Sequence, residues 1–306
     1  MDDADIKLLS EQEQTYWWHI SRRMILESIL QRFFSRHPGE SLERLQNRMN
    51  KSIRSWTSQD DACCHPEQNE SGVEGSPPLD SLTTPALGEA SLGMRIGRLG
   101  MTRRKKLKIL DVGCGTGENF YWLSKFGQVV GTDTNELAIQ LANQKGRAVL
   151  GRAEDLPFEN GEFNLVTAFD VLEHLSDERR ALGEWGRVLC PGGQIFISVP
   201  AHQWLFGPHD RALGHCRRYE LKQLLQLLRD NNFYPIFSTY VFGFAFPVFV
   251  LQRWLARYSS EQQTQYVNIP NWLNSLLIGL GRLEAHWLHF AKVPWGSSIV
   301  VLVRKQ

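Results

Sequence analysis

The chain has 306 residues, of which 42% are hydrophobic, so it can bury a sizeable core in one domain with additions. Its formal net charge is +1, which gives no global electrostatic signature for a nucleic-acid partner. Five cysteines occur without a C-x-x-C pair, which argues against a disulfide framework or a zinc site. We therefore expect a reducing, cytoplasmic setting. The acidic N-terminus has no signal-peptide layout.

Residues 11–37 place apolar side chains at helical spacings and predict a helix that ends at a Pro-Gly pair. We assign residues 1–39 to an N-terminal helical lid. The Trp17-Trp18 pair suits a lid over a ligand or, equally, an apolar face that packs on a sheet. Residues 40–102 lose this periodicity and accumulate Ser, Pro, Gly, Glu and Asn, which is typical of a disordered insertion. The basic run over 103–108 indicates a solvated strand entrance or attraction to an anionic membrane.

From residue 107 onward strands and helices alternate, which predicts a mostly parallel sheet with helices on both faces in a domain over 103–306. The strands are expected at 107–112, 128–132, 147–150, 163–169, 194–200, 233–242 and 297–303. The helices are expected at 117–126, 135–145, 176–189 and 221–231. Pro191-Gly192-Gly193 predicts the turn before the fifth strand.

No charged residue occurs from Phe233 to Gln252, a length close to a membrane span. Pro235 and Pro247 interrupt it, so we predict a strand followed by an apolar helix rather than a span. A helical insertion over 244–290 is rich in Trp, Leu and Phe with arginines beside them. This pattern is compatible with two alternatives, packing against the core or an interfacial helix in peripheral contact with a membrane.

The run Leu110-Asp-Val-Gly-Cys-Gly-Thr-Gly117 predicts a buried strand that enters a glycine-rich bend, which is typical of a nucleotide-binding element. Position 118 is Glu, so the third glycine of the dinucleotide pattern is absent. Asp111 at the strand tip would repel a pyrophosphate and attract an ammonium group. S-adenosylmethionine carries an ammonium and a sulfonium beside an adenosine, and it is the predicted cofactor. The loop residues expected to bind it are Asp111, Gly113, Cys114, Gly115 and Gly117.

Further cofactor contacts are expected where the next strands end. Asp133 follows the second predicted strand and can accept both ribose hydroxyls, with Thr134 beside it; a helix N-cap is the alternative. Ala153 and Glu154 follow the third strand and can reach the adenine edge, unless they form only a polar loop. Phe169 ends the fourth strand at the same edge and completes the predicted cofactor site.

Two clusters can carry chemistry. Asp170, Glu173 and His174 follow the fourth strand, where His174 can act as a general base. Their spacing also allows a helical metal triad, or Glu173 and His174 can simply cap the next helix. We assign no metal.

The second cluster lies in the loop after the fifth strand, where three histidines, an acid and three arginines gather. Arg217 and Arg218, with Tyr219, can hold a carboxylate or phosphate of a substrate. Asp210 or His215 can take a proton. Internal salt bridges that fix the loop are the alternative.

Five segments together resemble the class I S-adenosylmethionine-dependent methyltransferases: 110–117, Asp133, 153–158, 170–175 and 189–193. The resemblance implies a Rossmann-like, seven-stranded sheet of order 3-2-1-4-5-7-6 with strand seven antiparallel. It places the methionine end at Asp111 and the glycines, the ribose at Asp133, and the adenine at Ala153-Glu154. Family members often have an acid just before that alanine. This chain has Arg152 there, and Glu154 can substitute.

These patterns lead to one expected function, an S-adenosylmethionine-dependent methyltransferase that methylates a hydroxyl or carboxylate oxygen. The acceptor would be small, lipid-like or glycan-linked, and no nucleic-acid partner is expected. A non-catalytic S-adenosylmethionine-binding scaffold or sensor is the alternative from another class. A dehydrogenase is disfavoured by Asp111 and Glu118.

Overall fold

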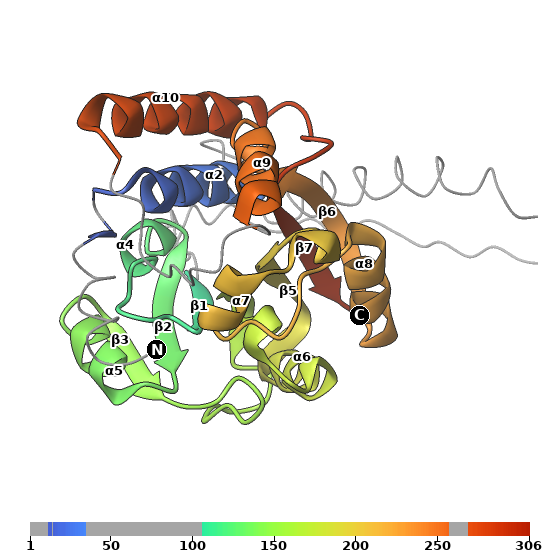
Figure 1. The fold of residues 1–306 in the computed structure, drawn as a ribbon. Helices are drawn as coiled ribbons and strands as arrows, with labels where there is room; N and C mark the ends of the chain where they lie inside the picture. The colour runs from blue at the N-terminus through green and yellow to red at the C-terminus, as the bar shows by residue number, and fades with distance from the viewer. Residues whose placement is uncertain (1–11, 14, 35–105, 257–268) are drawn as a thin grey trace, which may run out of the picture. The chain divides into compact units, whose positions relative to one another are not determined.

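The structure, a computed structural model, describes residues 12–13, 15–34, 106–256 and 269–306. Its centre is a seven-stranded sheet of order β3-β2-β1-β4-β5-β7-β6, in which β7 runs antiparallel to both neighbours and the other pairs are parallel (Figure 1). The strands are β1 (Leu107–Val112), β2 (Gly127–Asp133), β3 (Arg147–Leu150), β4 (Phe163–Phe169), β5 (Leu189–Pro200), β6 (Phe233–Val241) and β7 (Ser298–Lys305). The predicted fold class and strand order are confirmed.

Helices and two 3-10 turns connect these strands. They are α2 (Trp17–Phe34), α4 (Phe120–Leu123), α5 (Glu136–Ala142), η2 (Leu172–His174), α6 (Glu178–Val188), η3 (Gln203–Leu205), α7 (Pro208–Ala212), α8 (Leu221–Asp230), α9 (Phe246–Ala256) and α10 (Asn271–Trp287). The last two form the predicted helical insertion before the final strand.

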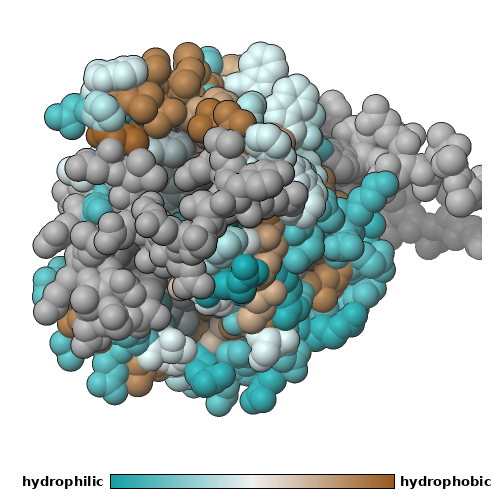
Figure 2. Space-filling model, viewed as in Figure 1, coloured by the Kyte–Doolittle hydropathy of each residue, from teal (hydrophilic) through white to brown (hydrophobic). Residues whose placement is uncertain are grey.

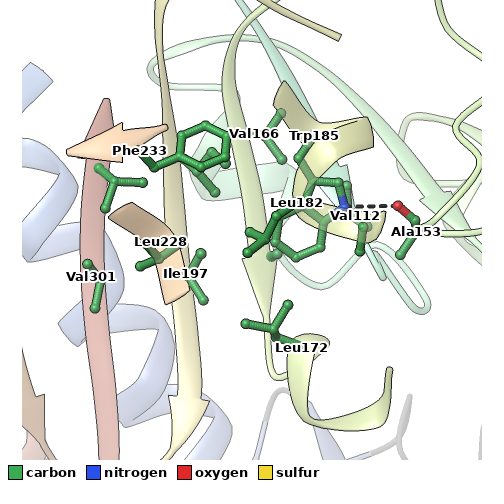
Figure 3. Packing of buried hydrophobic residues seen from close by; sticks show 14 of the residues in the cluster. Val112, Ala153, Val166, Leu172, Leu182, Trp185, Ile197, Leu228, Phe233 and Val301 are labelled. Carbon is green, nitrogen blue, oxygen red and sulfur yellow. Dashed lines mark hydrogen bonds between the residues drawn. The ribbon is translucent and has the colours of Figure 1, made fainter. Parts of the chain in front are cut away.

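Alternate residues along each central strand enter two separate cores. In β1, Leu110 faces a core closed by α6 and α8, whereas Ile109 faces a core closed by α2, α4 and α10. Figure 3 shows part of the first core, where Trp185 of α6 donates its indole N–H to the carbonyl oxygen of Ala153 at 3.1 Å. Because successive side chains point to opposite faces of a sheet, this packing places helices on both faces, as predicted.

Helix α2 belongs to the second core rather than standing apart from it. Ile25, Leu26, Ile29 and Leu30 are at most 1% exposed. The helix runs alongside α10 (Figure 1), and Ser28 donates its hydroxyl to the carbonyl oxygen of Ala285 in that helix. Of the two interpretations of the N-terminal helix, the structure shows packing on the sheet.

Three expectations about elements differ from the structure. Residues 191–193 do not precede the fifth strand but lie inside β5 as a bulge, because Phe163 pairs with Leu189 while Leu165 pairs with Gln194. Helix α4 is shorter than expected, since the chain is still in turns up to residue 119. The pattern of residues predicts no helix at α7, because its five residues are too few for a hydrophobic period.

The apolar stretch from Phe233 forms β6 and then α9, as expected. Within the described ranges, none of the helices is long and apolar enough to cross a bilayer. The insertion expected over 40–102 and the first part of the basic run lie outside the described residues.

Candidate functional site

The glycine loop begins where β1 ends and closes against the neighbouring elements. Gly113 has a φ of +66°, and a Cβ atom there would lie 2.4 Å from the Val171 side chain, so only glycine fits. The buried Cys114 donates its backbone N–H to the carbonyl oxygen of Thr132 at 3.0 Å. Gly115 and Gly117 also have positive φ angles. The glycines of the loop therefore leave its backbone uncovered by side chains at the carboxyl edge of the parallel strands. Ligands bind at this edge in such sheets.

Asp111 is buried directly beneath this loop. It is 1% exposed and accepts hydrogen bonds from the Thr167 hydroxyl at 2.6 Å and the Asn119 amide at 3.4 Å. Burial raises the pKa of its carboxyl to about 6, although these hydrogen bonds and the charge of Arg22 oppose the rise. A desolvated carboxylate of this kind interacts strongly with a cation brought near it.

Asp133 ends β2 and ties the glycine loop to the start of α5. Its two carboxylate oxygens accept the backbone N–H groups of Gly115 at 2.9 Å and Asn135 at 3.0 Å. Asn135, not Asp133, caps α5, so the alternative interpretation of Asp133 as the helix cap is wrong. Each carboxylate oxygen keeps a second lone pair for a ribose hydroxyl. Thr134 is exposed beside it.

The segment after β3 lines an open polar groove of about 260 Å³. Glu154 is part of the lining, 3.7 Å from Arg152. Ala153 is buried, and its carbonyl holds Trp185. Phe169, at the end of β4, is 5% exposed and packs edge-on against Phe196, so its ring belongs largely to the core.

Two residues that sequence reasoning did not assign to the site reach it from α2 and the loop. Arg22 lies 3.0 Å from Asp170 and 3.9 Å from Glu118, with its guanidinium 5.1 Å from the centre of the Trp18 ring. Glu118 also lies 3.4 Å from His19. These contacts link α2 to the glycine loop. The signal in the sequence was the Trp-Trp pair followed by arginine, which allowed a lid and packing on the sheet equally.

The three predicted catalytic residues are brought together by the long loop after β5. The His174 and His215 rings are edge to face with centroids 4.7 Å apart, and His215 Nδ1 lies 3.2 Å from Asp210 Oδ1. Asp210 is fully buried and also pairs with Arg218 at 2.7 Å and Arg253 at 3.3 Å. Burial alone would raise the pKa of Asp210, but the His215 and Arg218 hydrogen bonds and the Arg253 charge hold it well below its usual range.

The predicted substrate-binding side chains make internal contacts. Arg217 pairs with Glu178 and donates to the carbonyl oxygen of Leu175 at 3.2 Å. Arg218 pairs with Asp210, as above, and the Tyr219 hydroxyl donates to the carbonyl oxygen of Leu172 at 3.2 Å. These are the internal salt bridges of the alternative interpretation. Acceptor binding by the three residues stays a prediction.

The helical metal triad is not formed as the spacing suggested. Asp170 has a φ of +56° and η2 is a 3-10 turn of three residues, so the α-helical period does not apply. Asp170 instead contacts Arg22 and the Ser198 hydroxyl, at 3.0 and 3.1 Å. Among the described residues, the structure brings together a different group of potential ligands, Glu173, His174 and His215, with one ligand atom from each within 4.8 Å of the others.

Comparison with known proteins identifies a domain in this part of the chain. Residues 110–197 match the family model described as a methyltransferase domain. Tocopherol O-methyltransferase of Arabidopsis thaliana is 34% identical over 111 residues, covering 33% of this chain and 32% of that protein. Demethylmenaquinone methyltransferase of Staphylococcus aureus is 39% identical over 102 residues, covering 30% of this chain and 42% of that protein. The chain thus matches between about a third and two fifths of the length of these relatives.

Solved structures with a similar fold have low sequence identity. The YcgJ protein from Bacillus subtilis is 16% identical with a TM-score of 0.45, covering 66% of this chain and 93% of that one. A geranyl diphosphate methyltransferase in complex with S-adenosylmethionine is also 16% identical with a TM-score of 0.45, covering 65% and 78%. The family match, together with the strand order, confirms the predicted class I methyltransferase domain.

Proposed function

We propose that this chain, whose residues 110–197 form a methyltransferase domain of the class I S-adenosylmethionine-dependent family, transfers a methyl group from that cofactor to an oxygen atom. The observation that carries the proposal is the pair of carboxylates at the ends of β1 and β2, on either side of the glycine loop. Asp111 suits the ammonium of the methionine moiety, and Asp133 suits the ribose. A pyrophosphate in the glycine loop would be repelled by Asp111.

The remaining cofactor contacts follow the order of the strands. Gly113, Cys114, Gly115 and Gly117 would lie along the methionine and sulfonium. Thr134 would join Asp133 at the ribose, and Ala153 and Glu154 would meet the adenine from the groove after β3. Phe169 would support the pocket from the core.

The chemical step requires alignment more than activation. The methyl group is already bonded to a sulfonium, so the acceptor oxygen attacks in line, the new C–O bond forms as the C–S bond breaks, and S-adenosylhomocysteine leaves. A hydroxyl acceptor must also lose a proton. We assign this proton removal to the cluster of His174, Asp210 and His215, in which the buried Asp210 orients His215.

We further propose a lipid-like acceptor reached at a membrane surface. Large apolar side chains stay more than half exposed along α9, α10 and the residues after them: Val248, Leu251, Trp254, Trp272, Leu276, Leu283, Trp287, Phe290 and Trp295. Figure 2 shows hydrophobic residues gathered over α9 and α10 on the face it presents. Exposed tryptophans on an amphipathic helix are typical of contact with the lipid interface. The relatives named for tocopherol and demethylmenaquinone are compatible with such an acceptor.

Calorimetry with S-adenosylmethionine, S-adenosylhomocysteine and NAD tests the cofactor assignment. We expect S-adenosylmethionine and S-adenosylhomocysteine to bind and NAD not to bind. Asp133→Ala should weaken the binding of both compounds at least tenfold, because the contact with the ribose is lost. Preference for NAD would overturn the assignment. Incubating a lipid extract with methyl-labelled cofactor then tests catalysis. Tight cofactor binding without labelling of any lipid or metabolite would favour the scaffold or sensor instead.

A further inference from the structure

The carboxyl group of Glu173 has no role in the proposed function. Its side chain is completely buried, and neither carboxylate oxygen has a hydrogen-bond partner among the described residues. Buried carboxylates are normally hydrogen-bonded, ion-paired or bound to a metal, because desolvating a charge without compensation is strongly unfavourable. Two histidines, His174 and His215, each have a ring nitrogen within 4.8 Å of its carboxylate, and this points to the third of these.

Both histidines present the same ring nitrogen to the protein. His174 Nδ1 lies 3.3 Å from the carbonyl oxygen of Gly214, and His215 Nδ1 lies 3.2 Å from Asp210 Oδ1. Each partner is an acceptor, so these contacts assign the proton to Nδ1 and leave the Nε2 lone pair for a ligand. This is how metal-binding histidines are oriented, with the second nitrogen fixed by a carbonyl or carboxylate.

We propose that Glu173, His174 and His215 bind a divalent first-row metal ion, with Asp210 and Gly214 as the outer partners that orient the two imidazoles. Two imidazoles and one carboxylate form the donor set of catalytic zinc and of non-haem iron sites. One potential ligand atom of each residue, a ring nitrogen or a carboxylate oxygen, already lies within 4.8 Å of the other two. Bonds of about 2.0–2.2 Å would need only a further approach of roughly 1–2 Å.

The position of the site indicates what such an ion would do. His174 is exposed and His215 is half-buried, so the ion has an open side toward solvent and can take an acceptor oxygen as a further ligand. This inference rests on the proposed function and deepens it. A hydroxyl bound to the ion would have a lowered pKa, lose its proton to water and attack the sulfonium methyl as an alkoxide. The two histidines would then take part in proton removal through the ion rather than as free bases.

Equilibrium dialysis of the full chain against Zn²⁺, after removal of metal with a chelator, tests the site directly. We expect one equivalent of Zn²⁺ on the wild type, measured by elemental analysis. By calorimetry, Glu173→Gln, His174→Ala and His215→Ala should each weaken Zn²⁺ binding at least tenfold. His286→Ala is the matched control, because that exposed histidine on α10 lies outside the cluster, and it should bind as the wild type does.

A wild type that takes up less than a tenth of an equivalent would overturn the site, and this measurement does not depend on whether any variant folds. Equal affinity in the ligand variants and the control would overturn it as well. S-adenosylmethionine binding is measured on the same samples. If the wild type binds the cofactor but no metal, only the metal site is refuted. If the wild type does not bind the cofactor, the proposed function itself is refuted.

Discussion

Asp210, in α7, joins the loop around it to α9 through one buried carboxylate. Its partners are His215 and Arg218 from its own loop and Arg253 from α9. Gly207 also donates its backbone N–H to it at 2.9 Å. Removing the negative charge of Asp210 leaves these cationic partners buried without a counter-ion. This costs more free energy than losing an exposed ion pair.

We therefore expect Asp210→Asn to lower the free energy of unfolding by about 3–5 kcal/mol, measured by urea denaturation. The matched control is Asp230→Asn, because Asp230 pairs with Arg179 at 3.5 Å on the surface and is 37% exposed. That variant should lose less than about 1 kcal/mol. Similar losses in the two variants would contradict the structural role assigned to Asp210.

Asp111 should make cofactor binding depend on pH. Its carboxyl has a pKa of about 6 in the folded protein, above the ordinary 3.8, chiefly through burial. Only the ionised form attracts an ammonium group, so affinity for S-adenosylmethionine should fall about tenfold between pH 7.5 and pH 5.0. Calorimetry across this range measures it. Asp111→Asn should bind weakly with a flatter pH dependence, and a wild-type affinity that is constant over the range would exclude this role.

The same carboxyl has the opposite effect on stability. Because the folded-state pKa is raised, the folded protein binds the proton more tightly than the unfolded chain, and the cost of burying the charge grows as pH rises from about 4 to 6 and is complete above that. Asp111→Asn removes this cost. At pH 8 we expect the cofactor-free variant to be more stable by roughly 1–3 kcal/mol in urea denaturation. A variant no more stable than the wild type at that pH would contradict the raised pKa.

At the scale of elements, the crossing of α2 and α10 depends on one glycine. A Cβ atom at Gly281 would lie 2.2 Å from the Ser21 hydroxyl and 2.5 Å from its Cβ, whereas one at Gly279 would meet nothing within 4 Å. Both glycines are in α10. The two helix backbones can approach here because Gly281 has no side chain.

Gly281→Ala should accordingly destabilise the protein by about 1–3 kcal/mol through overpacking. Gly279→Ala should stabilise it by up to about 1 kcal/mol, since alanine is the better helix former. Thermal denaturation of the two variants compares them directly. Equal shifts of Tm in the same direction would show that the helix crossing is looser than the structure indicates.

Glu284, three residues after Gly281 in α10, ties the helical insertion to the end of β6. Its carboxylate accepts backbone N–H groups of Phe242, Gly243 and Phe244, at 2.5, 2.9 and 3.4 Å, where β6 ends. The insertion is thus anchored on its inner side while the apolar residues on its outer side stay exposed. Some apolar side chains of the insertion pack against the core and others stay exposed. This is why its sequence was compatible with both core packing and contact with lipid.

At the scale of the whole molecule, the exposed apolar side chains of α9 and α10 predict binding to lipid vesicles. Trp272→Ala combined with Trp287→Ala, in residues 70% and 58% exposed, should reduce sedimentation with phosphatidylcholine–phosphatidylglycerol vesicles roughly tenfold. Tyr121→Ala is the control, because that side chain is 77% exposed on α4. No binding by the wild type, or equal loss in the control, would contradict the membrane proposal.

Much of the fold could be predicted from the sequence. The expected bounds of β1, β3 and β4 agree with the structure because each strand is a short, mostly apolar run with polar residues or glycine beside it. The glycine loop was equally clear, since its residue types are required locally by backbone geometry. The bulge in β5 was not predictable, because residues 191–193 have the composition of a turn whether or not a neighbouring strand pairs with them.

The strands and the edge at which a cofactor would bind could therefore be predicted from the residues, because hydrophobic periods and glycine conformations depend on neighbouring residues. The strand order followed from the family resemblance. The pairing of the polar residues could not be predicted and is known from the folded chain alone. The folded chain joins Glu173 to His215, Asp210 to Arg253, and Arg22 to Asp170, over separations that no local pattern spans. Such pairings depend on which loops meet above the sheet, and this is set by packing of the whole chain.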